Sequence, residues 1–307
     1  MPLSASKPIS LRPSDLVLGG LAAIGVLCIW SGWVVISRLG ILRSLTIYDI
    51  AALRFFVALV VVSPFIAKYW PRDLAFWKIL VLSAGPGVPY VLIAFAGMQY
   101  APASHAGILL NGTLPIFAAL VAWMWLGQAP GRARIAGMLV ILSGCLLLGW
   151  DRSSDGLRPD AWIGQLLFMA AAMILAVYMA ATKLWNVTAM QALVTLPTVN
   201  AVIFIPIYLV FLPKAVASAP WSEILLQGLY QGIGPSVLGV LLFVQAVRML
   251  GSSRTAATMA GVPGLAALLA IPVLGEWPSA LAWIGLALTT LGILLTVRLK
   301  DRAEARI

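Results

Sequence analysis

Ten runs of apolar residues fill most of this chain, and each is about as long as a bilayer is thick. A helix needs about 20 apolar residues, at 1.5 Å per residue, to cross a hydrocarbon core of about 30 Å. Only short connections separate the runs. Their approximate limits are 16–37, 46–68, 77–98, 103–126, 133–150, 161–183, 189–212, 223–246, 253–275 and 278–298. We therefore predict an all-α integral membrane protein with ten transmembrane helices.

The composition excludes an ordinary soluble domain. The 307 residues are 62% hydrophobic and only 10% charged, whereas soluble domains carry about 25% charged residues. The net charge of +10 would favour nucleic-acid binding in a soluble protein. Here the basic residues lie in short connections and at the C-terminus, so we expect a lipid bilayer as partner and no nucleic acid. The two cysteines, Cys28 and Cys145, lie inside apolar runs. We interpret them as packing residues and predict no metal site and no cofactor.

The sequence repeats itself with a period of about half its length. Residues 103–128 and 251–276 align at one offset, which pairs Ser104 with Ser252 and Pro115 with Pro263. The chain therefore divides into a five-helix repeat over 1–150, a polar linker over 151–160, and a second five-helix repeat over 161–307 with a basic tail. A repeat with an odd number of spans enters the membrane the second time from the opposite face. We expect two inverted copies, an architecture typical of secondary transporters.

The positions of basic residues predict the orientation. Most of the 20 Lys and Arg residues fall on the side of the membrane that holds both chain ends. Because cytoplasmic loops carry the excess of positive charge, both termini are expected in the cytoplasm.

Glycine and proline interrupt equivalent runs in the two halves. Because proline lacks a backbone N–H, the carbonyl one turn before it loses its helical hydrogen bond. Within the membrane that carbonyl needs another partner from the protein or from a water-filled cavity. The predicted bends, which would let helices rock around a central cavity, are Pro86, Pro115, Pro235 and Pro263. Ordinary helix kinks are the alternative interpretation.

A second pair of runs carries glycines on one stripe. Gly137 and Gly144 share one helix face, and Gly285 and Gly292 repeat the pattern. Small residues allow close helix approach, so 133–150 and 278–298 are expected to form a scaffold or a subunit contact. The sequence leaves the oligomeric state open, with a monomer as one alternative.

None of the ten acidic residues lies near the centre of a run. Proton-driven pumps keep a carboxylate buried midway, so this pattern favours a facilitator over a carboxylate-coupled antiporter. Arg54 lies about a third of the way along the second run, five residues after Asp49. An ion pair with Asp49, or a side chain that reaches back to the outer surface, is the expected role of Arg54, and no cation is placed in the cavity.

Several polar and aromatic residues are candidates for substrate contact. Aromatic rings would supply flat apolar walls, the single histidine could bind a carboxylate, and amides inside a membrane need hydrogen-bond partners. The candidate substrate-binding residues are Trp30, Tyr90, His105, Asn111, Tyr178, Gln231 and Gln245. For each of them, packing or interhelical hydrogen bonding is the alternative.

The residues also resemble a known family. A proline-containing helix ends in Leu126-Gly127-Gln128 and is mirrored by Leu274-Gly275-Glu276, while Leu53-Arg54-Phe55 lies in the second helix. These features are similar to the EamA family of the drug/metabolite transporter superfamily, and the likeness covers nearly the whole chain. The resemblance implies export of small metabolites, often amino acids, across the bacterial inner membrane. The aromatic residues and the histidine that opens the fourth helix look most like the YddG-type amino-acid exporters. Gln128 departs from the family, whose members commonly carry an acidic residue there.

The sequence thus predicts a secondary transporter of a small molecule, most consistent with amino acids including aromatic ones, that works by alternating access. A multidrug or nucleotide-sugar carrier is the alternative within transport. A membrane-embedded transferase needs a nucleophile, an acid–base pair or metal ligands in a cavity, and one histidine without a mid-membrane carboxylate disfavours it. A non-transporting receptor is not excluded by any residue.

Overall fold

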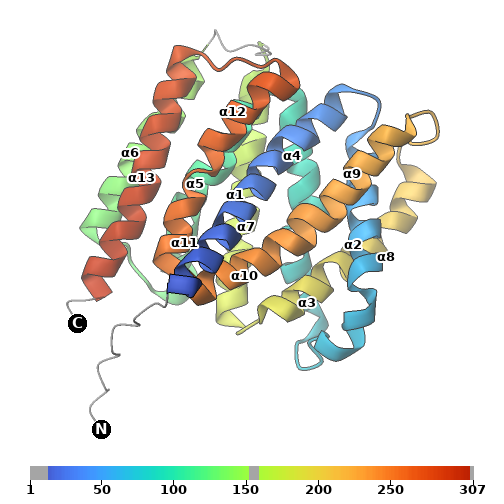
Figure 1. Cartoon of the computed structure of the whole chain (residues 1–307), viewed down its shortest axis with the longest axis horizontal. Coiled ribbons are helices and arrows are strands. Elements are labelled where there is room, and N and C mark those ends of the chain that lie inside the picture. Colours follow the sequence, from blue (N-terminus) through green and yellow to red (C-terminus); the bar gives the residue numbers. More distant parts are fainter. Residues whose placement is uncertain (1–12, 152–158, 305–307) are drawn as a thin grey trace.

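The protein is a bundle of long helices that run between two ends of the molecule (Figure 1). The structure, a computed structural model, describes residues 13–151 and 159–304. The helices are α1 (Pro13–Leu42), α2 (Ile47–Tyr69), α3 (Phe76–Ala84), α4 (Val88–Tyr100), α5 (Ala103–Leu126), α6 (Arg132–Trp150), α7 (Ala161–Leu184), α8 (Ala189–Phe211), α9 (Trp221–Ile233), the π-helical turn η1 (Gly234–Leu238), α10 (Gly239–Leu250), α11 (Ser252–Met259), α12 (Val262–Leu274) and α13 (Ala280–Glu304). Within the described ranges, ten segments are long and apolar enough to cross a membrane. The predicted ten-span protein is confirmed.

Three of the ten spans are interrupted. Residues 85–87 separate α3 from α4, η1 joins α9 to α10, and Ala260 and Gly261 separate α11 from α12. These interruptions fall where the sequence placed them, with one exception. The sequence also predicts an interruption at Pro115, but α5 runs unbroken through it. Proline inside a continuous helix removes one hydrogen bond and need not end it.

The two halves repeat each other in their helix termini. Thr46 begins α2 and Thr188 begins α8, and each forms a reciprocal capping box with the residue three positions later. Gly127 ends α5 and Gly275 ends α12, both in the left-handed conformation (φ 65° and 70°) that favours glycine. The same local signals therefore start and stop equivalent helices in both repeats.

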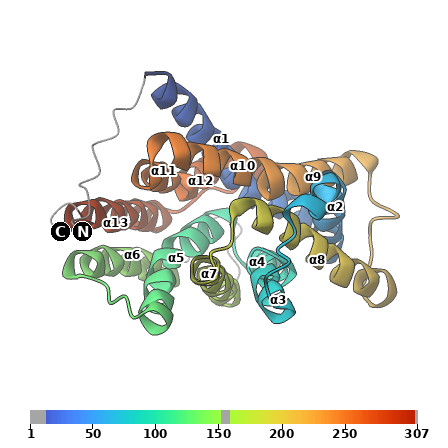
Figure 2. The ribbon, with the colours of Figure 1, turned by 90° about the horizontal axis from the view of Figure 1, so that it is seen from below.

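The halves are interlocked rather than merely side by side. The first helix of each half packs against the interrupted third span of the other: α1 contacts α10, and α7 contacts α4. The pairs α5–α7 and α12–α1 are related in the same way, and Figure 2 shows these neighbours in cross-section. α1 begins at the lower end of the bundle and its equivalent α7 begins at the upper end (Figure 1). The repeats are therefore inverted.

The helices α6 and α13 form a tightly packed pair at one edge of the bundle (Figure 2). A Cβ atom added to Gly144 would lie 2.6 Å from the carbonyl oxygen of Gly285, and one added to Gly292 would lie 2.7 Å from that of Gly137. Such distances require glycine. The glycine stripe therefore packs two helices of the same chain together. This is the scaffold role, one of the two roles expected from the sequence.

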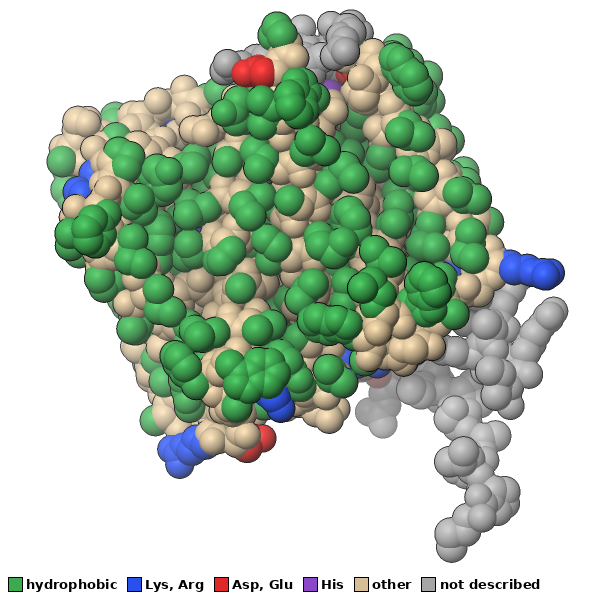
Figure 3. All heavy atoms as spheres, turned by 180° about the vertical axis from the view of Figure 1, so that it is seen from behind, with side chains coloured by type: hydrophobic (Ala, Val, Ile, Leu, Met, Phe, Trp, Pro, Cys, Tyr) green, Lys and Arg blue, Asp and Glu red, His purple; other side chains and the backbone are tan. Residues whose placement is uncertain are grey.

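The outer surface suits a hydrocarbon environment. Large apolar side chains such as Trp123, Val210 and Phe211 are exposed. Figure 3 shows apolar side chains over the middle of one face, with Lys and Arg near its margins. Exposure of so wide an apolar surface is unfavourable in water and favourable in lipid. Most of the expected polar linker (151–160) and the basic residues Lys7 and Arg12 lie outside the described residues.

Candidate functional site

A buried arginine is the most unusual side chain in the interior. Arg54 lies two turns into α2, about 10 Å from the start of the helix at 1.5 Å per residue, and is only 6% exposed. One of its terminal nitrogens donates to Gln231 Oε1 at 3.3 Å. Its Nε has no hydrogen-bond partner within the described part of the chain. Charge inside a membrane protein is costly and marks functional positions.

The expected pairing of Arg54 with Asp49, or its reach to the surface, is wrong. The Asp49 carboxylate belongs to the start of α2, where it accepts from the backbone and hydroxyl of Thr46, both at 2.8 Å. It also accepts from the Tyr208 hydroxyl and, at 3.0 Å, from the backbone N–H of Ala215. These four donors hold Asp49 to the end of α8, so it is not the counter-ion of Arg54.

Aromatic rings surround the guanidinium. Its central carbon lies 5.9 Å from the centroid of the Trp33 ring and 5.8 Å from that of Phe55. Trp33 in turn stacks on Tyr90, with ring centroids 5.9 Å apart and planes 17° apart. The indole nitrogen of Trp33 is also buried, and residues 13–151 and 159–304 offer it no hydrogen-bond partner. The contacts of Arg54 with the two ring faces are cation–π interactions, which stabilise a cation without neutralising it.

Gln231 joins this group to the neighbouring helices. It is fully buried, and its amide nitrogen donates to Ser37 Oγ at 2.9 Å and to Gln227 Oε1 at 3.2 Å. Its oxygen faces Arg54. We call Arg54, Trp33, Tyr90 and Gln231 the Arg54 cluster; it draws on α1, α2, α4 and α9. Tyr90 and Gln231 were expected at such a site, whereas Arg54 and Trp33 were missed.

His105 lies in a different part of the bundle. It opens α5, is fully buried, and its Nε2 lies 3.4 Å from Asp151 Oδ2. Its Nδ1 lies 3.2 Å from the amide nitrogen of Gln165 on α7. These contacts join α5, α6 and α7. The structure therefore gives His105 a helix-linking position apart from the Arg54 cluster.

The other candidate residues are dispersed. Trp30 stacks on Phe243 at 5.4 Å between ring centroids, which places it between α1 and α10. Tyr178 packs against Gly85, where an added Cβ would lie 2.4 Å from the Tyr178 Cβ. The Asn111 amide donates to the Gly107 carbonyl of its own helix at 3.1 Å, and Gln245 lies on an exposed face of α10.

The backbone groups freed at two helix interruptions have partners within the protein. Asn200 on α8 accepts from the backbone N–H of Val88 at 2.7 Å and donates to the Ser83 carbonyl at 2.8 Å. Pro235 cannot donate to the carbonyl of Gln231, and the Ser236 hydroxyl does so instead at 2.8 Å. The interruptions around Pro86 and Pro235 are thus stabilised by side chains. Pro263 lies in the first turn of α12, where the Val262 carbonyl accepts from Ser31 at 3.1 Å.

Polar contacts also tie the helices together at the upper end in Figure 1, where α1 ends and α5, α7 and α9 begin. We call this the distal end. There Arg38 Nε donates to Glu276 Oε1 at 2.8 Å, while Glu276 Oε2 accepts from the backbone N–H of Ala103 at 2.8 Å. Arg38 also donates to the carbonyl of Met98. Both charged side chains are buried, so this ion pair links the first half to the second.

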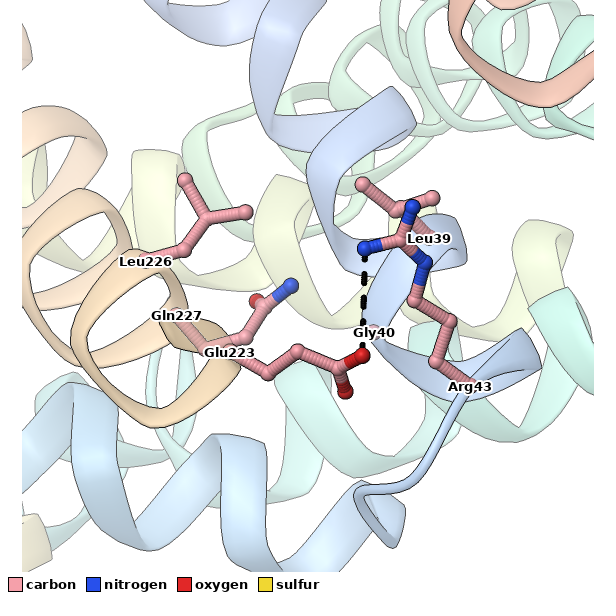
Figure 4. A pocket seen from close by; sticks show the side chains of 6 residues that line it. All are labelled: Leu39, Gly40, Arg43, Glu223, Leu226 and Gln227. Atoms are coloured by element: carbon pink, nitrogen blue, oxygen red, sulfur yellow. Dashed lines mark ion pairs between the residues drawn. The ribbon is translucent and has the colours of Figure 1, made fainter. Parts of the chain in front are cut away.

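A shallow surface depression, lined by residues of α1 and α9, lies at the same end (Figure 4). Figure 4 shows Arg43 and Glu223 facing each other across it, 3.8 Å apart. Glu223 also accepts from the Ser44 hydroxyl. The Arg54 cluster is packed rather than open: Trp33, Tyr90 and Gln231 are each at most 9% exposed. The structure therefore represents a conformation in which this interior group is closed off from water.

Inverted five-helix bundles, interlocked through interrupted helices around buried polar groups, define a membrane transporter of the inverted-repeat class. The sequence matches the EamA-like transporter family over residues 17–150 and 162–298, and the chain belongs to that family. It is therefore a multi-pass membrane protein built from two EamA repeats.

Two relatives and one solved structure extend the comparison. A probable terminal-alkyne amino-acid exporter of Streptantibioticus cattleyicolor is 30% identical over 223 residues, which cover 70% of this chain and 72% of that protein. The uncharacterized transporter YwfM of Bacillus subtilis is 24% identical over 229 residues, covering 71% and 73%. A crystal structure with 22% identity superposes with a TM-score of 0.60 over 95% of this chain and 99% of the other. The last similarity concerns the fold alone.

Proposed function

We propose that this protein exports small metabolites, amino acids above all, from the bacterial cytoplasm across the inner membrane by alternating access. The observation that carries the proposal is the reciprocal packing of α1 on α10 and α7 on α4. Inverted halves that grip each other in equivalent ways can exchange conformations and so open the interior to either side. The named activity of the 30% identical relative supports amino acids as substrates.

In this proposal both termini lie in the cytoplasm, as the distribution of Lys and Arg favours, and the distal end therefore faces the periplasm. The buried pair Arg38–Glu276 then closes the outer gate. Opening outward requires that pair to separate, and the interrupted spans at Pro86 and Pro235 supply the bends. The interior would hold substrate between the halves, with Tyr90 and Gln231 among its contacts.

A carrier of anionic substrates, such as a nucleotide-sugar carrier, is the second candidate. The sequence disfavoured it because no cation was placed in the interior, and Arg54 now supplies one. A single arginine can match one carboxylate, whereas a diphosphate calls for several cationic or N–H donors. Amino acids therefore remain the preferred substrates.

Flux into liposomes tests the function. Purified protein is reconstituted, and uptake of labelled amino acids is measured with and without a pH gradient, with protein-free liposomes as control. We expect saturable uptake without a gradient, because no carboxylate lies midway along a span. Uptake that needs the gradient would replace the facilitator by a proton-coupled carrier. Absence of uptake for every amino acid under both conditions would overturn the proposed function.

A further inference from the structure

Two hydrogen-bond donors inside the Arg54 cluster find no acceptor among the residues that the structure describes. They are Arg54 Nε and Trp33 Nε1, and both are buried. A buried donor without a partner costs free energy, and a charged one costs more. The guanidinium contacts Gln231, Trp33 and Phe55, all of which are uncharged. Among the described residues, the cluster thus holds a positive charge and N–H groups for which the structure shows no carboxylate partner.

A purely structural role explains this arrangement poorly. Structural buried arginines are paired with a carboxylate and fully hydrogen-bonded, as Arg38 is with Glu276 and Met98. Arg54 makes one hydrogen bond of 3.3 Å to a neutral amide. An apolar residue would fill the same space without the free-energy cost of burying a charge. We therefore expect the charge of Arg54 to act in a conformation other than this closed one.

We propose that Arg54 and Trp33 form the receptor for the carboxylate of the transported molecule. This inference rests on the proposed function and deepens it by naming the recognised group. A guanidinium offers paired N–H donors that match the two oxygens of a carboxylate. The Trp33–Tyr90 stack lies beside it and supplies an apolar wall for the rest of the substrate.

In the absence of substrate, the Gln231 side chain takes the place of the carboxylate as hydrogen-bond acceptor for Arg54. In the closed conformation its amide oxygen accepts from Arg54, and its nitrogen is held by Ser37 and Gln227. When a substrate carboxylate enters, it replaces the neutral Gln231 oxygen as the acceptor of the Arg54 hydrogen bond. The carboxylate is charged and therefore forms the stronger hydrogen bonds. The site therefore selects monocarboxylates, including zwitterionic amino acids, over their amides and esters.

Thermal unfolding of the purified full-length protein tests this recognition. The probes are L-propargylglycine, which is a terminal-alkyne amino acid, and its carboxamide; ligand that binds the folded state raises Tm. We expect the acid to raise Tm and the amide to have no effect at the same concentration. R54Q should increase the half-maximal concentration of the acid at least about tenfold, because hydrogen bonds to a charged group are lost. R54K should be intermediate, and W33F, which keeps an aromatic ring without the N–H, should weaken binding less than R54Q.

Arg72 provides the matched control. It is an exposed arginine near the lower end of the bundle, after α2, so R72Q removes the same charge outside the cluster and should respond like the unmodified protein. If R54Q fails to fold, R54K and W33F still report on the two donors. Equal responses to acid and amide, or an unchanged response in R54Q and R54K, would overturn the carboxylate receptor.

A second probe pair separates this inference from amino-acid export. Isovalerate and isovaleramide differ at the carboxylate but lack an amino group. If isovalerate raises Tm through Arg54 while no amino acid binds or is transported, amino-acid export fails and the receptor stands. If amino acids are transported equally well by R54Q, the receptor fails and export stands. Stabilisation by inorganic phosphate in preference to isovalerate would replace the receptor by a phosphate site.

Discussion

The carboxylate of Glu276 lies 2.8 Å from Arg38 Nε, and this buried contact joins the end of α1 in the first half to the residue that follows α12 in the second. The equivalent residue to Glu276 in the first half is Gln128, which accepts from Lys183 Nζ at 3.3 Å at an exposed site. Within the described residues, Gln128 at the lower end therefore has no buried ion pair like the one that Glu276 forms at the distal end.

Loss of one partner of this pair should destabilise the protein. E276Q leaves Arg38 buried with an uncompensated charge, so we expect a loss of about 3–5 kcal/mol in the free energy of unfolding. R43Q is the control, because Arg43 is half exposed and its ion pair with Glu223 is long, at 3.8 Å. The free energy of unfolding of R43Q should fall by less than about 1 kcal/mol. Reversible unfolding in mixed micelles measures both. A smaller effect for E276Q than for R43Q would contradict the proposed importance of the buried pair.

The α6–α13 contact should tolerate no side chain at its closest points. An alanine at Gly144 would place its Cβ 2.6 Å from the Gly285 carbonyl, so G144A must push the helices apart and should cost about 1–3 kcal/mol. G149A changes the same helix at a position where an added Cβ meets nothing within 4 Å. It should be neutral or slightly stabilising, since alanine favours helix. The difference in Tm between the two variants is the measurement, and equal values would argue against close packing.

Much of the fold follows from local sequence signals. Apolar runs set the ten spans, and residues such as Thr46 and Gly127 start and stop helices in both halves for the same capping reasons. The break around Pro86 was visible as glycine and proline together. The break expected at Pro115 was wrong, because a single proline costs one hydrogen bond, which the continuous packing of α5 can offset.

The candidate site was harder to predict, because its composition depends on contacts between distant helices. No local signal indicates that the Tyr208 hydroxyl, on α8, donates to Asp49. Nor does one indicate that Arg54 has no carboxylate partner among the described residues. Nor does spacing alone distinguish Trp30 from Trp33; packing against α10 or α4 decides which ring reaches the interior. A charge well inside an apolar run was the available signal. On that ground alone, the position of Arg54 in the sequence indicates a functional residue.

The interruption between α3 and α4 should depend on Asn200. N200A removes the acceptor for Val88 N–H and the donor to Ser83 O, and buried backbone groups left without partners cost about 1–3 kcal/mol each. N111A is the matched control, because the Asn111 amide donates to a carbonyl one turn earlier in its own helix rather than to a helix interruption. We expect a much larger loss of Tm for N200A than for N111A. Similar losses would mean that water or another side chain satisfies the break.

The orientation can be tested with reporters at defined positions. The chain end that follows α13 is expected in the cytoplasm, and so is the short connection between α2 and α3, where Lys68 and Arg72 lie. A fluorescent protein fused after the last residue should fluoresce, while alkaline phosphatase fused there should be inactive, because the phosphatase matures only in the periplasm. Single cysteines introduced at Arg43 and Arg72 give the complementary readout in whole cells. A membrane-impermeant thiol reagent should label the distal position at Arg43 and leave Arg72 unlabelled until the cells are opened. The opposite labelling pattern would place the Arg38–Glu276 pair at the cytoplasmic gate and reverse the proposed direction of opening.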